Sequence, residues 1–131
     1  KMSEIIRGTY GEDTLAKVMS DDVKLADSPI IVVEGIRRMA DIEYLKKLPN
    51  FILIEIFADI AKRLARIQKR RENPDDATKT MEQFLNDHKR STEISIAEVV
   101  SHATEKIDNN GDTESLYKQL DKLVKKYENQ N

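Results

Sequence analysis

The chain has 131 residues, of which 39% are hydrophobic and 35% charged, a balance typical of one globular domain with its own core. Lysine and arginine (22) nearly balance aspartate and glutamate (24), so the net charge of -2 excludes a strong overall field attracting nucleic acid or membranes. The absence of cysteine excludes disulfides, thiol chemistry and cysteine-bound metals. We expect a single domain over residues 1–131 and a cytoplasmic location, since no signal peptide is visible and no apolar run approaches the roughly 20 residues that cross a bilayer.

The first part of the chain has the pattern of helices. A short helical stretch is expected from Ser3, with breaks around Gly8 and Gly11. A second helix is expected over residues 12–20, because apolar residues recur there at spacings of three and four. The residues of this predicted inner face are Leu15, Val18 and Met19.

The segment Pro29–Arg37, PIIVVEGIR, is the most informative part of the sequence. Its apolar run, Ile30–Val33, predicts a strand that is buried on both faces, and Gly35 is expected to turn the chain into a helix. Glu34 and Arg37 would then lie at the carboxyl edge of a sheet, where open α/β folds bind ligands. Glu34 is therefore a candidate for holding magnesium or its waters in phosphoryl transfer, although it could equally pair with a neighbouring arginine.

A second apolar strand is predicted over Phe51–Ala58, FILIEIFA, after a helix that Pro49 and Asn50 end. The inward residues of that helix are expected to be Met39, Ile42, Leu45 and Leu48. Two strands joined by one helix form a βαβ unit, whose right-handed crossover makes the strands parallel. Nearly continuous apolar runs also fit a parallel sheet covered on both faces. The sequence therefore predicts the α/β class.

The helix expected over residues 59–72, with Asp59 as a possible N-cap, carries a basic face. Arg63, Arg66 and Arg70 fall within about 60° of each other around the helix axis, beside an apolar stripe. Arginine suits phosphate because its planar fork donates two parallel hydrogen bonds. The alternatives are a solvated basic face and nucleic-acid binding, and we expect no nucleic acid here because no aromatic residues are interleaved with the cations.

After the basic helix, the sequence predicts two helices, a short strand and a closing helix. The helices are expected around residues 81–85 and 94–100, and the strand near Lys106 and Ile107. Asn109, Asn110 and Gly111 form a turn signal. The closing helix would begin with Asp112 or Thr113 as its cap, and its expected inward residues are Leu116, Leu120, Leu123, Val124 and Tyr127.

Three further polar residues are candidates for a chemical role. Glu55 lies in the middle of an apolar strand and needs a partner, so we interpret it as one half of a structural pair with an arginine. His88 and His102 have no partner ligand four residues away, which makes a metal role improbable for both.

The order of these segments resembles the latter two-thirds of P-loop nucleotide kinases, above all dephospho-CoA kinases and archaeal adenylate-kinase-related proteins. The likeness extends over nearly the whole chain and rests on PIIVVEGIR, FILIEIFADIAKRLARIQKR and TEKIDNNGDTESLYKQLDKLV. Its most specific piece, KIDNNGDTESL, resembles the strand, Asp-Asn-x-Gly turn and helix that end members of this family. The resemblance implies a three-layer, P-loop-NTPase-like parallel sheet flanked by helices.

On the nucleotide side, the resemblance implies that Asn109, Asn110 and Gly111 lie beside the adenine of ATP. It also implies that residues 73–94 form a mobile lid, and that the helix leading into this lid holds the transferring phosphates. The arginines concerned are Arg63, Arg66 and Arg70.

On the acceptor side, Glu34-Gly35-Ile36-Arg37 resembles the Asp-Gly-x-Arg that ends the third strand of the family, with glutamate in place of the usual aspartate. This implies substrate contacts for Gly35 and Arg37. The stretch from Met2 to Arg7 resembles the start of the acceptor-binding helices and adds Ser3 and Arg7 to the expected substrate-binding residues.

The sequence departs from the family pattern in two ways. It contains no G-x-x-x-x-G-K-[ST] and lacks the first strand that carries this loop, and its acceptor-binding helices look shortened between Arg7 and Tyr10. We expect the printed chain to lack the N-terminal strand and loop of a longer protein, the alternative being a naturally truncated relative.

The resemblance implies an ATP- and magnesium-dependent phosphotransferase that moves the γ-phosphoryl group to a small nucleotide-like acceptor. The printed chain alone would be inactive, because the missing loop supplies the groups that bind the β- and γ-phosphates. The alternatives are a non-catalytic nucleotide-binding or regulatory module, and a helical scaffold whose basic helix binds an acidic partner. The acceptor and the oligomeric state stay open.

Overall fold

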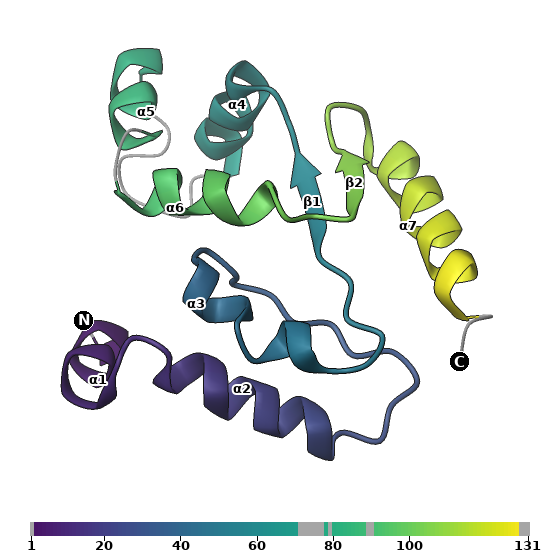
Figure 1. Cartoon of the computed structure of the whole chain (residues 1–131). Coiled ribbons are helices and arrows are strands. Elements are labelled where there is room, and N and C mark those ends of the chain that lie inside the picture. The colour runs from purple at the N-terminus through teal and green to yellow at the C-terminus, as the bar shows by residue number, and fades with distance from the viewer. Residues whose placement is uncertain (1, 71–77, 79, 89–90, 129–131) are drawn as a thin grey trace.

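The computed structural model of the chain describes residues 2–70, 78, 80–88 and 91–128 and has a mixed α/β fold. Within these residues a small sheet has two parallel strands, flanked by helices. Figure 1 shows the first three helices below the strands, the next three on the left of the first strand, and the last helix on the right of the second strand. The elements are α1 (Met2–Tyr10), α2 (Thr14–Leu25), α3 (Met39–Ile42), the 3-10 helix η1 (Leu45–Lys47), β1 (Ile54–Phe57), α4 (Ile60–Arg70), α5 (Met81–His88), α6 (Ser91–Val100), β2 (Glu105–Asp108) and α7 (Thr113–Glu128).

The two strands pair so that Ile54 lies opposite Glu105 and Phe57 opposite Asp108. On one face of the sheet, the Lys106 ammonium lies 3.7 Å from a Glu55 carboxylate oxygen and 4.2 Å from the centre of the Phe57 ring. The prediction that Glu55 forms a structural pair is confirmed, although its partner is a lysine rather than an arginine.

The prediction of a buried strand at Ile30–Val33 is wrong for the described structure. The segment has no regular structure, and Ile30, Ile31 and Val32 are 52%, 40% and 85% exposed. An extended segment becomes a strand only when a neighbour takes its backbone hydrogen bonds, and no described segment lies beside this one as a strand. The parallel partner of β1 is β2 instead, so the expected βαβ unit between residues 30–33 and 51–58 is not formed.

The N-terminal helices differ from the expectation in their ends and faces. α1 continues through Gly8, and the break comes at Gly11, whose φ of 117° is in the left-handed region that favours glycine. α2 buries Ala16 and Ser20, whereas Val18 is 54% exposed. The predicted inner face of this helix is therefore wrong at Val18.

The helix predicted after Gly35 is shorter than expected. Gly35 does make a turn, with a φ of 81°, but only one helical turn (α3) and the 3-10 helix η1 follow before the chain reaches Asn50, whose φ is 63°. Ile42 and Leu45 are buried as predicted, and they belong to the small core of the molecule.

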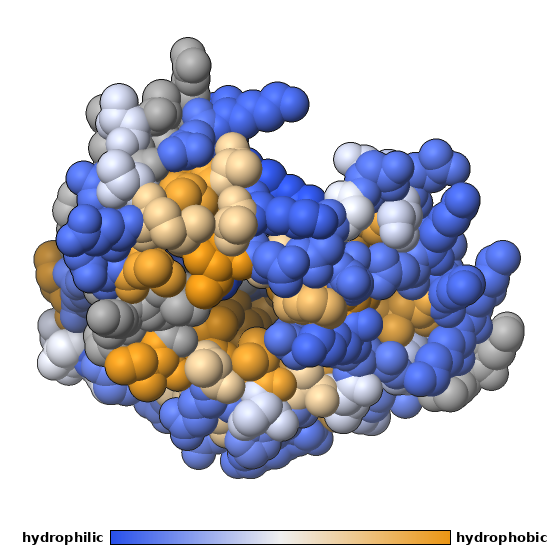
Figure 2. Space-filling model, turned by 90° about the horizontal axis from the view of Figure 1, so that it is seen from above, coloured by the Kyte–Doolittle hydropathy of each residue, from blue (hydrophilic) through white to orange (hydrophobic). Residues whose placement is uncertain are grey.

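The core joins the helical layers through apolar side chains from seven elements. α3 contacts α6, and α5 contacts both α4 and α6. The buried apolar residues in the described part are Ala16, Ile42, Leu45, Leu64, Phe84, Val99 and Ile107. Many other large apolar side chains are exposed, and Figure 2 shows apolar side chains gathered around a hollow on the face that it presents.

Two expectations concern other parts of the chain. Of the predicted lid over residues 73–94, residues 73–77, 79, 89 and 90 lie outside the described residues, and the rest includes α5. Among the described helices, none has the length and hydropathy that a bilayer crossing requires.

Candidate functional site

The carboxyl ends of the two strands lie side by side, and each strand leads directly into a helix. β1 ends at Phe57 and is followed by α4, while β2 ends at Asp108 opposite Phe57 and is followed by α7. The start of α7 is capped, since the Asp112 carboxylate accepts a hydrogen bond of 2.8 Å from the Ser115 N–H. This confirms Asp112 as the cap. Both helix N-termini therefore begin at one edge of the sheet.

Asn110 ties these two helix starts together. Its side-chain oxygen accepts a hydrogen bond of 2.7 Å from the Asp59 N–H, and its backbone oxygen accepts one of 2.6 Å from the Lys62 ammonium. Its own N–H donates to the Asp108 carboxylate over 2.8 Å. The β2–α7 turn is thus fixed to the first turn of α4 by polar contacts.

The predicted arginines of α4 do not all point to this turn. Arg66 donates a hydrogen bond of 3.2 Å to the backbone oxygen of Gly111. Arg63 instead places its guanidinium 5.7 Å from the centre of the Phe84 ring on α5, and its Nε is buried without a hydrogen-bond partner in the described part of the chain. Arg70 is exposed in the last turn of the helix. Of the three, the structure brings Arg66 to the turn and directs Arg63 to α5.

Lys62 and Gln119 also form hydrogen bonds at the carboxyl ends of the strands. The sequence interpretation included neither residue among the candidate site residues. Lys62 lies one helical turn before Arg66, so spacing alone would have placed it on the same face. The Gln119 amide donates to the Asp108 backbone oxygen over 2.8 Å and accepts from the Asp108 N–H over 2.9 Å. No local sequence signal identifies this pairing, because it joins a helix side chain to the backbone of a strand.

An open depression of about 530 Å³ lies beside the turn. Two of its lining residues, Lys118 and Lys122, are cationic, and Asp108 and Gly111 line it where the strand gives way to the turn. The remaining lining residues are Ser115 and Gln119. Cations, hydroxyl and amide groups around an open hollow can bind an anionic or hydrogen-bonding ligand of nucleotide size.

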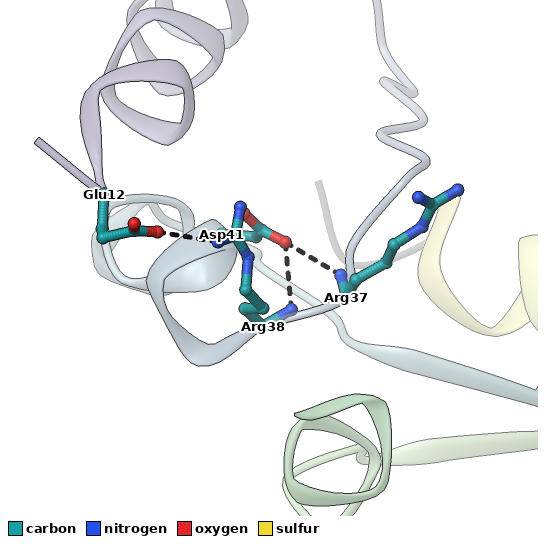
Figure 3. A network of polar contacts seen from close by, with 4 residues as sticks. All are labelled: Glu12, Arg37, Arg38 and Asp41. Atoms are coloured by element: carbon teal, nitrogen blue, oxygen red, sulfur yellow. Dashed lines mark hydrogen bonds and ion pairs between the residues drawn. The ribbon is translucent and has the colours of Figure 1, made fainter. Parts of the chain in front are cut away.

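The acceptor-side residues form a separate group. Figure 3 shows the Asp41 carboxylate, which is 8% exposed, between the backbones of Arg37 and Arg38. It accepts hydrogen bonds of 2.9 Å and 3.0 Å from their N–H groups. The Arg38 guanidinium binds the Glu12 carboxylate at 2.7 Å. The Arg37 side chain points away from Asp41 (Figure 3), and Arg37 is exposed.

The acceptor-side residues do not lie at the end of a described strand. Glu34 and Gly35 are exposed and belong to an irregular segment, which corrects the expectation that Glu34 and Arg37 end a strand. Ser3 and Arg7 lie on α1, which packs on α2 at the opposite end of the molecule from the β2–α7 turn (Figure 1). Asp41 is the residue that the sequence interpretation missed here. A buried acid in the first turn of a helix is a capping signal, but this helix has only four residues.

A metal site made by a cluster of side chains does not occur in the described part of the chain. Nowhere in the described ranges do three or more histidine, cysteine, aspartate or glutamate side chains come together in a way that could hold a metal ion. Glu34 is exposed on its irregular segment, and the carboxylates of Asp41 and Asp108 accept backbone hydrogen bonds. The prediction that Glu34 holds magnesium or its waters stays a prediction, and we assign no chemical step to that ion.

At the other end of β2, Glu105 fastens α7 to the sheet. Its carboxylate accepts hydrogen bonds from the Lys126 ammonium and the Tyr127 hydroxyl. These hydrogen bonds, the one from Lys126 first, lower the pKa of the Glu105 carboxyl. The same contacts raise the pKa of Lys126 and of Tyr127. α7 is thus held to β2 near its C-terminus by Lys126 and Tyr127 and near its middle by Gln119.

Comparison with known proteins gives relatives but no activity. No protein-family model matches the chain, and no solved structure matches it significantly. The chain is 29% identical to a UPF0200 protein of Methanosarcina barkeri over 93% of its length, 28% identical to one of Staphylothermus marinus over 95%, and 26% identical to one of Methanothermobacter thermautotrophicus over 92%. It covers 66%, 64% and 63% of the length of these relatives, so each of them has about a third of its sequence outside the match. The homologues of this chain are UPF0200 proteins of archaea.

Proposed function

We propose that this chain is part of an ATP-dependent phosphotransferase with a P-loop-type three-layer fold, which transfers the γ-phosphoryl group to a small nucleotide-like acceptor. The observation that supports this most is the contact between the basic face of α4 and the Asn110–Gly111 turn, at the carboxyl ends of two parallel strands. Ligands of open α/β sheets bind at this edge. A cytoplasmic location belongs to the same proposal, because nucleotide phosphotransfer needs a supply of ATP.

The depression beside the turn is the proposed nucleotide site. Its volume of about 530 Å³ lies within the roughly 300–1,000 Å³ that ligand sites occupy. The turn backbone at Gly111 and the Ser115 hydroxyl can hydrogen-bond a base or ribose, and Lys118 and Lys122 can bind phosphate oxygens. ATP would supply the group that is transferred, and these residues would bind and orient it.

Arg66 has the proposed role nearest to the chemistry. It uses one guanidinium N–H on the Gly111 backbone oxygen, which fixes its position, and its other donors stay available for phosphate. A guanidinium held in place before the ligand arrives stabilises the charge that develops on a transferring phosphoryl group. Lys62, held by the Asn110 backbone oxygen, adds a second cation on the same helix face.

Arg37 is the proposed acceptor contact. Asp41 fixes the backbone of Arg37 without engaging its side chain, so the guanidinium can reach a ligand while its segment stays anchored.

The sequence has no G-x-x-x-x-G-K-[ST], and the amides that bind the β- and γ-phosphates would come from a longer protein. The second candidate function is a nucleotide-binding or regulatory module without transfer activity.

The test measures ATP binding by calorimetry and phosphoryl transfer to dephospho-CoA and to nucleoside monophosphates, using the protein of the complete reading frame. We expect Arg66→Ala to lower turnover by roughly 100- to 1,000-fold, the effect of losing one pre-positioned donor, without a change in the far-UV circular dichroism. Lys17→Ala, which removes an exposed cation from α2, is the matched control and should leave turnover unchanged.

Three outcomes of these experiments would contradict the proposed phosphotransferase activity. ATP binding without transfer to any acceptor would favour the non-catalytic module. Equal turnover in Arg66→Ala and Lys17→Ala would mean that the basic face of α4 is merely solvated. Binding of a short RNA that weakens steeply with salt, without ATP binding, would replace the nucleotide site with a nucleic-acid surface.

A further inference from the structure

Asn110 is the only asparagine of the sequence that precedes a glycine. Asparagine is a thermolabile residue type, and a following glycine has no side chain to hinder attack of its backbone nitrogen on the asparagine amide. This pair lies in the β2–α7 turn, where Gly111 is exposed and Asn110 half-buried. The turn therefore contains the sequence feature that deamidation requires, at a place that solvent reaches.

The two groups that react in a deamidation are free in this turn. They are the Gly111 N–H and the side-chain NH2 of Asn110, and neither takes part in a hydrogen bond within the described part of the chain. The side-chain oxygen of Asn110 instead accepts a hydrogen bond of 2.7 Å from the Asp59 N–H. Negative charge develops on this oxygen when Cγ is attacked, and a donor already aimed at it stabilises that charge. The turn thus leaves the nucleophile and the leaving group available and polarises the carbonyl that is attacked.

We infer that Asn110 is a deamidation site, at which the folded turn itself supports conversion to aspartate and isoaspartate. The Gly111 nitrogen forms a bond to Cγ of Asn110, and its proton passes through water to the side-chain NH2 group, which leaves as ammonia. Water then opens the resulting succinimide ring. Opening at Cγ gives aspartate, whereas opening at the backbone carbonyl carbon gives isoaspartate. The reaction consumes water alone and involves no oxidation or reduction.

Both products place their new carboxylate beside a donor that is already there. In aspartate, the carboxylate replaces the side-chain amide whose oxygen the Asp59 N–H binds at the start of α4. In isoaspartate, the carboxylate forms from the backbone carbonyl whose oxygen lies 2.6 Å from the Lys62 ammonium. Hydrogen bonds to an ionised acceptor are stronger than those to a neutral one, and the start of a helix favours negative charge. The turn therefore accommodates either product.

Conversion would change the charge of the candidate site. It adds a carboxylate to the turn that Lys62 and Arg66 contact. The added negative charge repels anions, so these two cations would bind an anionic ligand less tightly. This consequence rests on the proposed function, whereas the modification itself does not.

The test is peptide mapping by mass spectrometry on the protein of the complete reading frame, incubated at mildly alkaline pH in native buffer and in concentrated urea. We expect Asn110 to convert in both, at a native rate within about 10-fold of the rate in urea, because exposed turns open with a free energy near zero. Asn50, which is exposed and precedes a phenylalanine, is the internal control and should stay intact. Gly111→Ala should remove most of the conversion. A Cβ at this position would lie 3.4 Å from the Ser115 Cβ, an ordinary contact, so this variant keeps the fold.

The ratio of the two products tests the contribution of the structure. The Lys62 ammonium polarises the backbone carbonyl of Asn110, which favours attack of water at that carbon and hence isoaspartate. Lys62→Met removes the ammonium and keeps most of the side-chain length, so it should lower the share of isoaspartate among the products. Lys17→Met, at an exposed position of α2, is the matched control and should leave this share unchanged.

Any of three results would overturn this inference. They are conversion of Asn110 in urea alone, conversion of Asn50 at the same rate as Asn110, and an isoaspartate share that is the same in Lys62→Met as in the wild type. None of these measurements involves a nucleotide, so a negative result here is distinct from a failure of the proposed function.

Discussion

β2 and the segment Ile30–Val33 form an instructive pair. The sequence of β2, Glu-Lys-Ile-Asp, has a single apolar residue and low β-propensity, yet it forms a strand. Ile30–Val33 consists entirely of β-branched apolar residues and remains irregular and largely exposed. β2 has β1 on one side and the Gln119 amide on the other, whereas no described strand pairs with the apolar segment. Hydrogen-bond partners for the backbone, rather than β-propensity alone, determine which of the two segments forms a strand.

The largest expected difference between these regions lies in the cost of removing an apolar side chain. In the 131-residue chain, Ile107→Ala should lower the free energy of unfolding by about 2–5 kcal/mol, because Ile107 is 2% exposed. Val32→Ala, at a residue that is 85% exposed, should change it by less than about 0.5 kcal/mol. Urea unfolding measures both. Similar losses of unfolding free energy at the two positions would mean that Ile30–Val33 is packed in solution. That result would contradict the contrast drawn here between this segment and β2.

A smaller effect is expected from the backbone partner of β2. Gln119→Leu keeps the size of the side chain but removes both hydrogen bonds to Asp108, so it should cost about 1 kcal/mol and speed exchange of the Asp108 amide. Lys122→Leu, on the same helix and without a hydrogen bond to Asp108, is the control. If the two variants left the Asp108 amide equally protected, the closure of this edge by Gln119 would be disproved.

The smallest effect concerns the ionic anchor of α7. The pKa of Glu105 is lowered in the folded chain, so its contribution to stability is present above the ordinary glutamate pKa of about 4.3 and is lost as the pH falls through the folded value. The pKa values of Lys126 and Tyr127 are raised, so their contributions are lost only as the pH rises through their folded values, in the alkaline range.

Glu105→Gln should therefore flatten the dependence of stability on pH between about 7 and 3, a range that includes the titration of glutamate. Urea unfolding at several pH values measures this, with Glu114→Gln on the exposed side of α7 as control. A wild-type dependence that survives Glu105→Gln unchanged would show that the anchor contributes nothing to the folded state.

The sequence predicted the elements that depend on local signals. The closing helix with its Asp112 cap, the helix that carries Arg66, and the second strand of the parallel pair at Lys106–Ile107 follow from periodicity and turn residues. The predicted strand at Ile30–Val33 is wrong, because strand formation there depends on a pairing strand from elsewhere in the chain. The predicted inner position of Val18 is wrong, because α2 packs through the face that carries Ala16.

The candidate site was predictable to a similar extent. Helical spacing placed Arg63, Arg66 and Arg70 on one face, but packing against Phe84 draws Arg63 to α5. The turn at Asn110 was visible as a turn signal, whereas its three hydrogen bonds to Asp59, Lys62 and Asp108 join residues from three segments. Contacts of this kind follow from the packing of whole elements, which spacing within one helix does not describe.

The most direct test of the account is an NMR titration of the isotopically labelled protein of the complete reading frame with ATP. We expect saturable shifts that are largest at the amides of Asn110, Gly111 and Ser115, around the depression beside the β2–α7 turn. Absence of shifts at high ATP concentration, or shifts confined to α1 and α2, would contradict a nucleotide site at the carboxyl ends of the strands.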